Sequence, residues 1–174
     1  MHWRVFAAGK PALTYAKSGI EEYLKRLKRG SKVELFYLKT GDSQSVSSNL
    51  LDRSKDTLRI ALDERGQAWS TEDLVERINT WEMNPGIKTI SLLIGASDGH
   101  TKDLRSQADE VWALSPLTLQ HELALVVLLE QLHEEARQST GCASGLNETV
   151  AGLCRKAVVS NYREKLMNSE AMFG

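Results

Sequence analysis

The sequence predicts an α/β protein built around a parallel sheet. Short apolar, β-branched runs alternate along its 174 residues with longer segments whose apolar residues recur every three to four positions. This alternation is typical of strands joined by crossover helices, which makes neighbouring strands parallel. The length suits one well-packed domain of this class and is too short for two ordinary ones.

Five strands are expected. They are the runs at residues 3–7, 33–38, 58–63, 89–94 and 111–114. The run at 89–94 is almost wholly apolar or β-branched, which indicates a strand buried on both faces of the sheet.

Two longer helices are expected in the first half of the chain. Residues 13–28 place their apolar side chains in one stripe, and Gly30 follows as an end signal. Ser70, three residues before Asp73, forms the pattern of a capping box for a helix that runs to about Glu82.

The remaining segments are read from composition. Residues 41–49 are rich in Ser, Gly, Asp and Gln and predict a loop. A short helix should follow Gly99, and a further helix should contain the continuous apolar residues 123–129, a run that needs covering on every side. The chain is expected to loosen at residues 139–145 before a last helix at about 147–167.

Two tight loops follow the fourth and fifth predicted strands. In the first, Gly95 and Gly99 bracket small residues, so that the backbone can approach a ligand closely. The second is the leucine-rich segment at residues 115–119. Loops at the carboxyl ends of strands are where open α/β sheets bind small molecules, which predicts one cleft formed by both loops.

These segments together resemble one family. The patterns LLIGASDG, WALSPLTLQH and VVLLEQ, with VFAAGK and IEEYLKRL near the N-terminus, are similar to those of the ribosomal large subunit methyltransferase H family. That family belongs to the knotted SPOUT class of S-adenosylmethionine-dependent RNA methyltransferases. The resemblance covers residue 3 to about residue 137 and is weak between 40 and 57.

The resemblance implies a fold, an activity and a site. It implies a SPOUT-type trefoil knot, a cytoplasmic homodimer with an active site completed across the interface, and methylation of a pseudouridine in large-subunit (23S) ribosomal RNA. Residues 1–138 would form one methyltransferase domain, and residues 139–174 a divergent tail. His121 would orient the substrate, although helix capping or packing is an equal alternative. The implied donor-binding positions are Leu62, Gly95, Leu114, Ser115, Pro116, Leu117, Thr118 and Leu119.

Several departures from the family pattern fall on the side that would meet the acceptor. Gln120 stands where the family usually has Pro, Leu125 where it has a basic residue, and His133-Glu134 where it has Tyr-Arg. The family's Tyr-His-basic C-terminal tail has no match, and the segment at 46–57 is short enough to lack one helix. Donor binding is therefore expected to survive, whereas recognition of the acceptor RNA is expected to be weaker or changed.

Composition excludes some classes of protein. No apolar run approaches the length of a membrane span, and no signal peptide or metal-ligand spacing is visible, so neither a membrane nor a metal is expected. Net charge is −1, but residues 1–33 hold eight Lys or Arg against two Glu, a basic segment that suits RNA phosphate or simple solvation equally. Pairing of Cys142 with Cys154 stays open, with two reduced thiols the simpler reading.

Three functions remain as alternatives. The two loops favour the first two of these. The first is an active large-subunit rRNA pseudouridine methyltransferase. The second is a SPOUT methyltransferase with another RNA substrate. The third is a non-catalytic dimeric relative that binds RNA or a protein. The missing tail favours the second and third.

Overall fold

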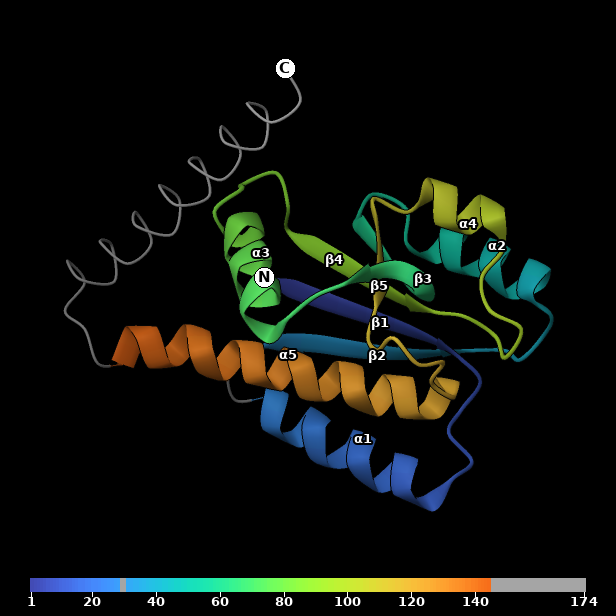
Figure 1. The fold of residues 1–174 in the computed structure, drawn as a ribbon, viewed down its shortest axis with the longest axis horizontal. Coiled ribbons are helices and arrows are strands. Elements are labelled where there is room, and N and C mark those ends of the chain that lie inside the picture. The colour runs from blue at the N-terminus through green and yellow to red at the C-terminus, as the bar shows by residue number, and fades with distance from the viewer. Residues whose placement is uncertain (29–30, 145–174) are drawn as a thin grey trace. The chain divides into compact units, whose positions relative to one another are not determined.

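A five-stranded parallel sheet forms the centre of the computed structural model, which describes residues 1–28 and 31–144 (Figure 1). The strands are β1 (His2–Ala8), β2 (Lys32–Leu38), β3 (Leu58–Ala68), β4 (Thr89–Ile94) and β5 (Glu110–Ala113). Their order in the sheet is β2-β1-β4-β3-β5, and every neighbouring pair is parallel. The predicted fold class is therefore confirmed at the level of a parallel sheet flanked by helices.

Helices cover both faces of the sheet. They are α1 (Thr14–Leu27), α2 (Ser43–Arg53), α3 (Thr71–Glu82), α4 (Lys102–Gln107) and α5 (His121–Ser144). Helices α1, α3 and α5 pack on one face, and α2 and α4 pack on the other (Figure 1). Successive residues of β1 show the two layers, since Val5 is buried in the first core and Phe6 in the second. A central strand buried on both faces explains its apolar sequence.

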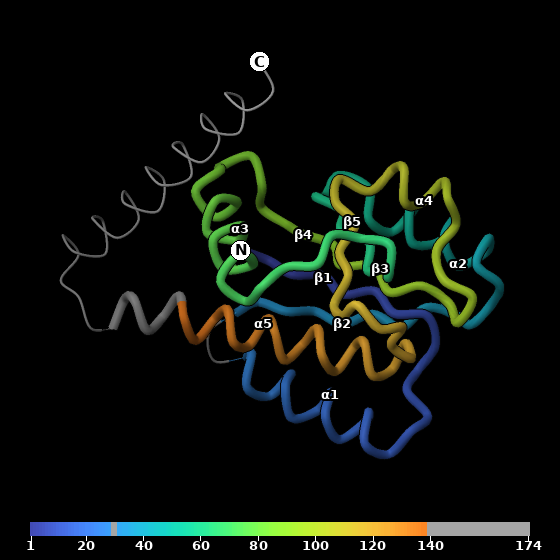
Figure 2. The backbone as a smooth tube through the Cα atoms, in the orientation of Figure 1, coloured from blue at the N-terminus to red at the C-terminus, as the bar shows by residue number. Residues whose placement is uncertain are grey.

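Helices α1 and α5 lie side by side in close contact (Figure 2). The contact is close because Gly19 presents no side chain: a Cβ atom there would lie 3.0 Å from Cγ1 of Val126. The apolar run of α5 is mostly covered by the chain's own core, in which Leu125, Leu128 and Leu129 are buried. The sheet and α1 thus cover much of the surface that the sequence left without a partner.

Three expectations about single elements were wrong. Residues 41–49 do not form one loop, because α2 begins at Ser43 with the Asp42 carboxylate accepting a hydrogen bond from the N–H of Ser45. The segment at 41–49 therefore contains the start of a helix. Strand β3 continues beyond Asp63 to Ala68, because after a shift in register it pairs again with β5. The chain does not loosen at residue 139, because α5 continues to Ser144.

One expectation concerns residues that the structure does not describe. The predicted last helix at 147–167 lies outside the described residues. The chain divides into two compact units, Met1–Ala136 and Arg137–Gly174, and all contacts discussed below belong to the first. Within the described ranges no helix is both long and apolar enough to cross a bilayer.

Candidate active site

A cavity of about 540 Å³ opens at the carboxyl ends of the neighbouring strands β4, β3 and β5. Open α/β sheets bind small molecules at this edge, and sites of this kind have volumes of about 300–1,000 Å³. The cavity is lined by the end of β3, the loops after β4 and β5, and the first turn of α5: residues 62–65, 94–100, 112, 114, 115, 117–121 and 124.

The structure brings the predicted site residues together. Seven of the eight predicted donor-binding residues line the cavity: Leu62, Gly95, Leu114, Ser115, Leu117, Thr118 and Leu119. His121 lines it as well, whereas Pro116 is not among the lining residues. Two loops that are separate in the sequence therefore meet at one cavity, as expected. The ligand that each residue binds stays a prediction.

Glycines allow the loop after β4 to fold tightly against the cavity wall. A Cβ atom on Gly95 would lie 3.0 Å from both Cε1 and Nδ1 of His100, closer than side chains normally pack. Gly99 has a φ of +83°, a conformation that favours glycine, and its N–H donates to the carbonyl of Ala96 at 2.9 Å. The loop therefore turns back on itself and exposes backbone groups along the cavity.

His100 is a buried residue of this loop that sequence reasoning did not assign to the site. Its Nε2 lies 3.0 Å from the carbonyl oxygen of Leu93 and donates a hydrogen bond to it, which leaves Nδ1 unprotonated. Nδ1 is buried and has no hydrogen-bond partner among the described residues. Burial lowers the pKa of His100, so the ring is neutral near pH 7. The ring lies directly beside Gly95 and so supports the glycine loop.

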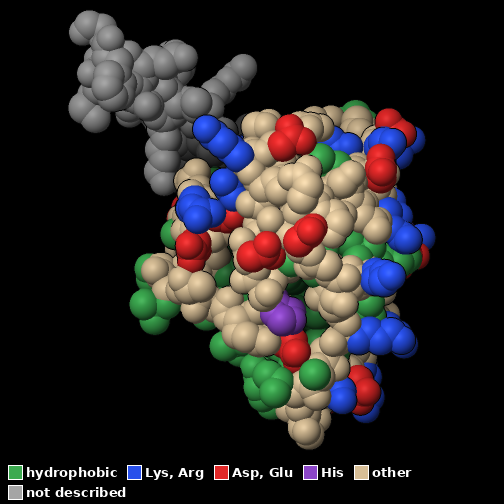
Figure 3. Space-filling view, turned by 90° about the vertical axis from the view of Figure 1, so that its right-hand side faces the viewer, with side chains coloured by type: hydrophobic (Ala, Val, Ile, Leu, Met, Phe, Trp, Pro, Cys, Tyr) green, Lys and Arg blue, Asp and Glu red, His purple; other side chains and the backbone are tan. Residues whose placement is uncertain are grey.

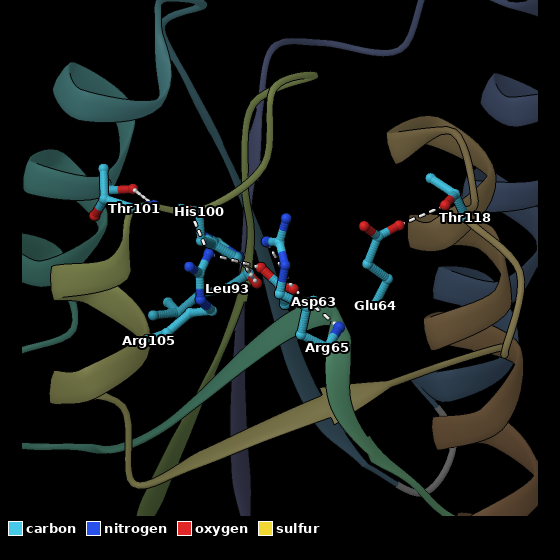
Figure 4. Close-up of polar contacts among 9 residues, drawn as sticks. Asp63, Glu64, Arg65, Leu93, His100, Thr101, Arg105 and Thr118 are labelled. Atoms are coloured by element: carbon cyan, nitrogen blue, oxygen red, sulfur yellow. Dashed lines mark hydrogen bonds and ion pairs between the residues drawn. The ribbon is translucent and has the colours of Figure 1, made fainter.

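Charged side chains from β3 continue the cavity wall (Figure 4). Asp63 is only 4% exposed at its side chain, and its Oδ2 lies 3.2 Å from Nη1 of Arg105 on α4. Nη1 of Arg65 lies 3.5 Å from the other carboxylate oxygen of Asp63. The sequence signal that could have identified this wall is the run Asp63-Glu64-Arg65 directly at the end of a predicted strand.

The loop after β5 is tied to this wall and to itself. The Thr118 hydroxyl donates to the Glu64 carboxylate, which joins the loop to β3 (Figure 4). The N–H of Leu117 donates to the Ser115 hydroxyl oxygen at 3.0 Å. Leu117 itself is 72% exposed. The loop is therefore held by polar contacts while it presents an apolar side chain to solvent.

An aromatic wall lies beside the loop. Trp112 lines the cavity and stacks on Trp81, with ring centroids 5.8 Å apart and planes 6° from parallel. Its Nε1 donates to the Glu110 carboxylate at 2.7 Å. Stacking and this hydrogen bond together fix the indole, so its position in the wall is defined by residues outside the cavity.

The first turn of α5 closes the cavity. The side-chain oxygen of Gln120 accepts hydrogen bonds from the N–H groups of Glu122 and Leu123, at 3.1 and 3.2 Å, and so caps the helix. Nε2 of His121 lies 4.0 Å from the Glu122 carboxylate. Capping is thus done by Gln120, which leaves the His121 ring at the cavity.

Comparison with known proteins identifies the family. The pattern described as "Predicted SPOUT methyltransferase" matches residues 1–139. The chain is 41% identical to the ribosomal RNA large subunit methyltransferase H of Thermus thermophilus, over 76% of this chain and 90% of that protein. The chain belongs to this family of SPOUT methyltransferases. The protein of the same name from Deinococcus radiodurans is 39% identical over 81% of this chain and 96% of its own length.

A solved structure is also similar. It is the SpoU methyltransferase AviRb from Streptomyces viridochromogenes in complex with the cofactor AdoMet, at 14% identity and a TM-score of 0.39. The match covers 81% of this chain and 61% of that chain.

The departures from the family pattern have structural consequences. Leu125, where the resemblance predicts a basic residue, is 2% exposed and packs in the core. His133 packs against Tyr23, with ring centroids 6.1 Å apart, and its Nδ1 lies 3.9 Å from the Glu134 carboxylate. Neither Leu125 nor Glu134 supplies a cation for an RNA. In the described part of the chain, no cluster of three or more His, Cys, Asp or Glu side chains suits a metal ion.

Proposed function

We propose that this chain is an S-adenosylmethionine-dependent methyltransferase that modifies a pseudouridine of large-subunit (23S) ribosomal RNA in the cytoplasm. One observation carries the proposal: the glycine loop after β4 and the leucine loop after β5 line a single cavity of suitable volume. Family membership supports a methyl donor as the ligand of this cavity, since the relatives are named as methyltransferases of ribosomal RNA.

The residues present fit this donor. Methyl transfer from a sulfonium requires donor and acceptor to be held in line more than it requires acid–base help. Backbone groups on tight loops suit that task, and a side chain at Gly95 would fill the space beside His100. In this assignment the donor would be held by the predicted residues Leu62, Gly95, Leu114, Ser115, Pro116, Leu117, Thr118 and Leu119.

The charges of the lining also suit the donor. The described lining residues include three carboxylates, those of Asp63, Glu64 and Asp98, and one guanidinium, that of Arg65. S-adenosylmethionine carries a sulfonium, an ammonium and a carboxylate, which gives a net charge of +1. The negative field of the wall attracts this cation, and the attraction weakens once methyl transfer leaves a neutral thioether. The carboxylates of the wall therefore favour the release of S-adenosylhomocysteine and its replacement by S-adenosylmethionine.

A homodimer is part of the proposal. Four exposed apolar side chains, Leu13, Tyr15, Leu117 and Leu123, lie near the meeting point of α1, α5 and the loop after β5. These elements are joined there, because the Tyr15 hydroxyl donates to Gln120 at 3.4 Å and the Glu122 carboxylate accepts from the N–H of Leu13 at 3.0 Å. We call the four side chains the apolar patch. A second copy covering the patch would bring its own residues to the cavity. Within each chain, we also expect the trefoil knot of the family.

Mass spectrometry of ribosomal RNA tests the function. In a strain from which the gene has been deleted, 23S rRNA should lack one methyl group on a pseudouridine, and a plasmid copy of the gene should restore it. A methylation profile that is unchanged by deletion would contradict the proposal.

A second candidate is a SPOUT methyltransferase that acts on a different RNA. The observation that favours it is the loss of cations at Leu125 and Glu134, since phosphate and base contacts by basic residues position an RNA. The same mass spectrometry distinguishes the candidates, because a methyl group missing from another RNA would support this one. A non-catalytic relative would leave every RNA unchanged.

A further inference from the structure

Arg65 is the one Lys or Arg among the described residues that line the cavity (Figure 4). We propose that its guanidinium binds a phosphate of the acceptor RNA at the rim of the cavity. This inference rests on the proposed function and adds to it a residue that replaces the cations missing from the family pattern.

The guanidinium is free to exchange its present partner. Its side chain is 63% exposed, and its closest carboxylate contact, to Asp63, measures 3.5 Å. An exposed ion pair of this kind contributes little to stability. Asp63 is also engaged elsewhere, since Arg105 lies 3.2 Å from its other oxygen. Arg65 can therefore turn from Asp63 to an arriving anion without leaving a buried carboxylate unpaired.

The backbone that carries Arg65 is firmly placed. The register between β3 and β5 shifts between Leu62 and Gln67, so the intervening residues bulge from the sheet at the cavity. Gly66 holds the bulge against β5, because a Cβ atom there would lie 2.6 Å from the backbone of Trp112. The N–H of Arg65 donates to the Asp63 carboxylate at 3.0 Å. A flexible cationic side chain thus stands on a fixed part of the rim.

Exposure and charge favour an RNA phosphate over the donor's own carboxylate. A side chain exposed at the rim meets a ligand that arrives from solvent, whereas the donor is expected between the two loops. A guanidinium also matches the two oxygens of a phosphate in geometry. The other charged groups of the lining do not offer this contact, because Glu64, Asp98 and Asp63 are carboxylates, which repel a phosphate.

Charged side chains are unevenly distributed on the face that Figure 3 shows, which is the right-hand side of the molecule in Figure 1. Acidic side chains and one histidine lie near the middle of this face, whereas Lys and Arg side chains lie toward its edges, most of them along the right-hand edge. A strand of RNA that follows the basic edge would meet few cations nearer the middle. A single arginine at the cavity therefore has a large share in holding the target nucleotide.

The test compares full-length wild type with Arg65→Gln, Arg65→Lys and a control, Arg53→Gln. Arg53 is exposed at the end of α2, away from the cavity, and its Nε bonds the Asn49 side chain at 2.9 Å. Ribosomes from a strain lacking the family's methyltransferase are the acceptor. Methyl transfer and ribosome binding are measured over a range of salt concentrations, and S-adenosylhomocysteine binding is measured by calorimetry.

For Arg65→Gln we expect the KM for ribosomes and their Kd to rise about tenfold, with kcat and the Kd of S-adenosylhomocysteine unchanged. The slope of log affinity against log salt should fall by about one, and Arg65→Lys should regain part of the affinity. An unchanged KM and salt slope would overturn the proposal, as would an equal loss of S-adenosylhomocysteine binding. A wild type that binds ribosomes without methylating them would instead contradict the proposed function. In that case, ribosome binding by the Arg65 variants would still test whether Arg65 contacts the RNA.

Discussion

Leu125 is a buried core residue of α5. It is 2% exposed in the core between α5 and the sheet, at a position where the resemblance predicts a basic residue. Leu125 belongs to the hydrophobic core formed by α1, α3, α5 and the sheet, so a charge placed there would be buried among apolar side chains. A basic residue at position 125 would therefore be unfavourable in this core.

We predict that Leu125→Arg lowers the free energy of unfolding by about 3 kcal/mol or more, because it buries an unpaired charge. Leu125→Met, which keeps the volume and polarity, should cost less than about 1.5 kcal/mol. Urea unfolding of both variants measures the difference. An arginine variant as stable as wild type would show that this position can still accept the family's cation.

The site was partly predictable from individual residues. Gly95, Leu114 and Thr118 lie in recognisable loops after apolar strands, so their place at the sheet edge followed from pattern. Asp63 and Arg105 did not stand out, because they are 42 residues apart and pair only once β3 and α4 meet in space. His100 was missed because its ring bonds a backbone carbonyl of β4, a partner that no side-chain pattern reveals.

At the scale of elements, α5 and α1 are joined by a buried carboxylate. Glu122 in the first turn of α5 accepts hydrogen bonds from the N–H groups of Ala12 and Leu13, at 3.1 and 3.0 Å, just before α1 begins. The free N–H groups at a helix start attract a negative charge. These bonds, that of Leu13 first, lower the pKa of Glu122 below its ordinary value of 4.5.

This contact predicts a dependence of stability on pH. Because the pKa is lowered on folding, the stabilisation is present above the ordinary value and is lost as pH falls through the lower, folded value. Glu122→Gln should therefore lower the midpoint of urea unfolding at pH 7, and its difference from wild type should shrink below about pH 4. The matched control is Glu76→Gln on the exposed face of α3, which should change neither. A difference between Glu122→Gln and wild type that persists unchanged at pH 3 would contradict this account.

The elements were predicted best where burial is strongest. Strand β4 and the Ser70 cap of α3 follow from sequence, because an apolar run and a capping pattern are local signals. Helix α2 does not, since its inner face rests on little more than Val46 and Leu50 in a serine-rich segment. Its start is also supported from outside, where Asp98 accepts from the N–H of Ser43. A helix stabilised by a distant loop leaves no such signal in its own residues.

At the scale of the whole molecule, the proposed dimer depends on the apolar patch. We predict that Leu123→Glu weakens dimerisation, because a charge replaces an exposed apolar side chain of the patch. Met83→Glu, at an exposed apolar residue just after α3, should leave the assembly unchanged. Sedimentation velocity measures both variants. Wild type and Leu123→Glu that sediment alike, as monomers or as dimers, would rule out this patch as the interface.

The central claim is that the loops after β4 and β5 form one site for S-adenosylmethionine, and calorimetry on the full chain tests it most directly. S-adenosylhomocysteine should bind wild type at one site per chain, and Gly95→Ala should weaken binding at least about tenfold, because the new methyl group takes up space beside His100. Gly86→Ala, in the turn before β4, should bind as wild type does. Absence of binding to wild type, or equal binding by Gly95→Ala, would contradict the account.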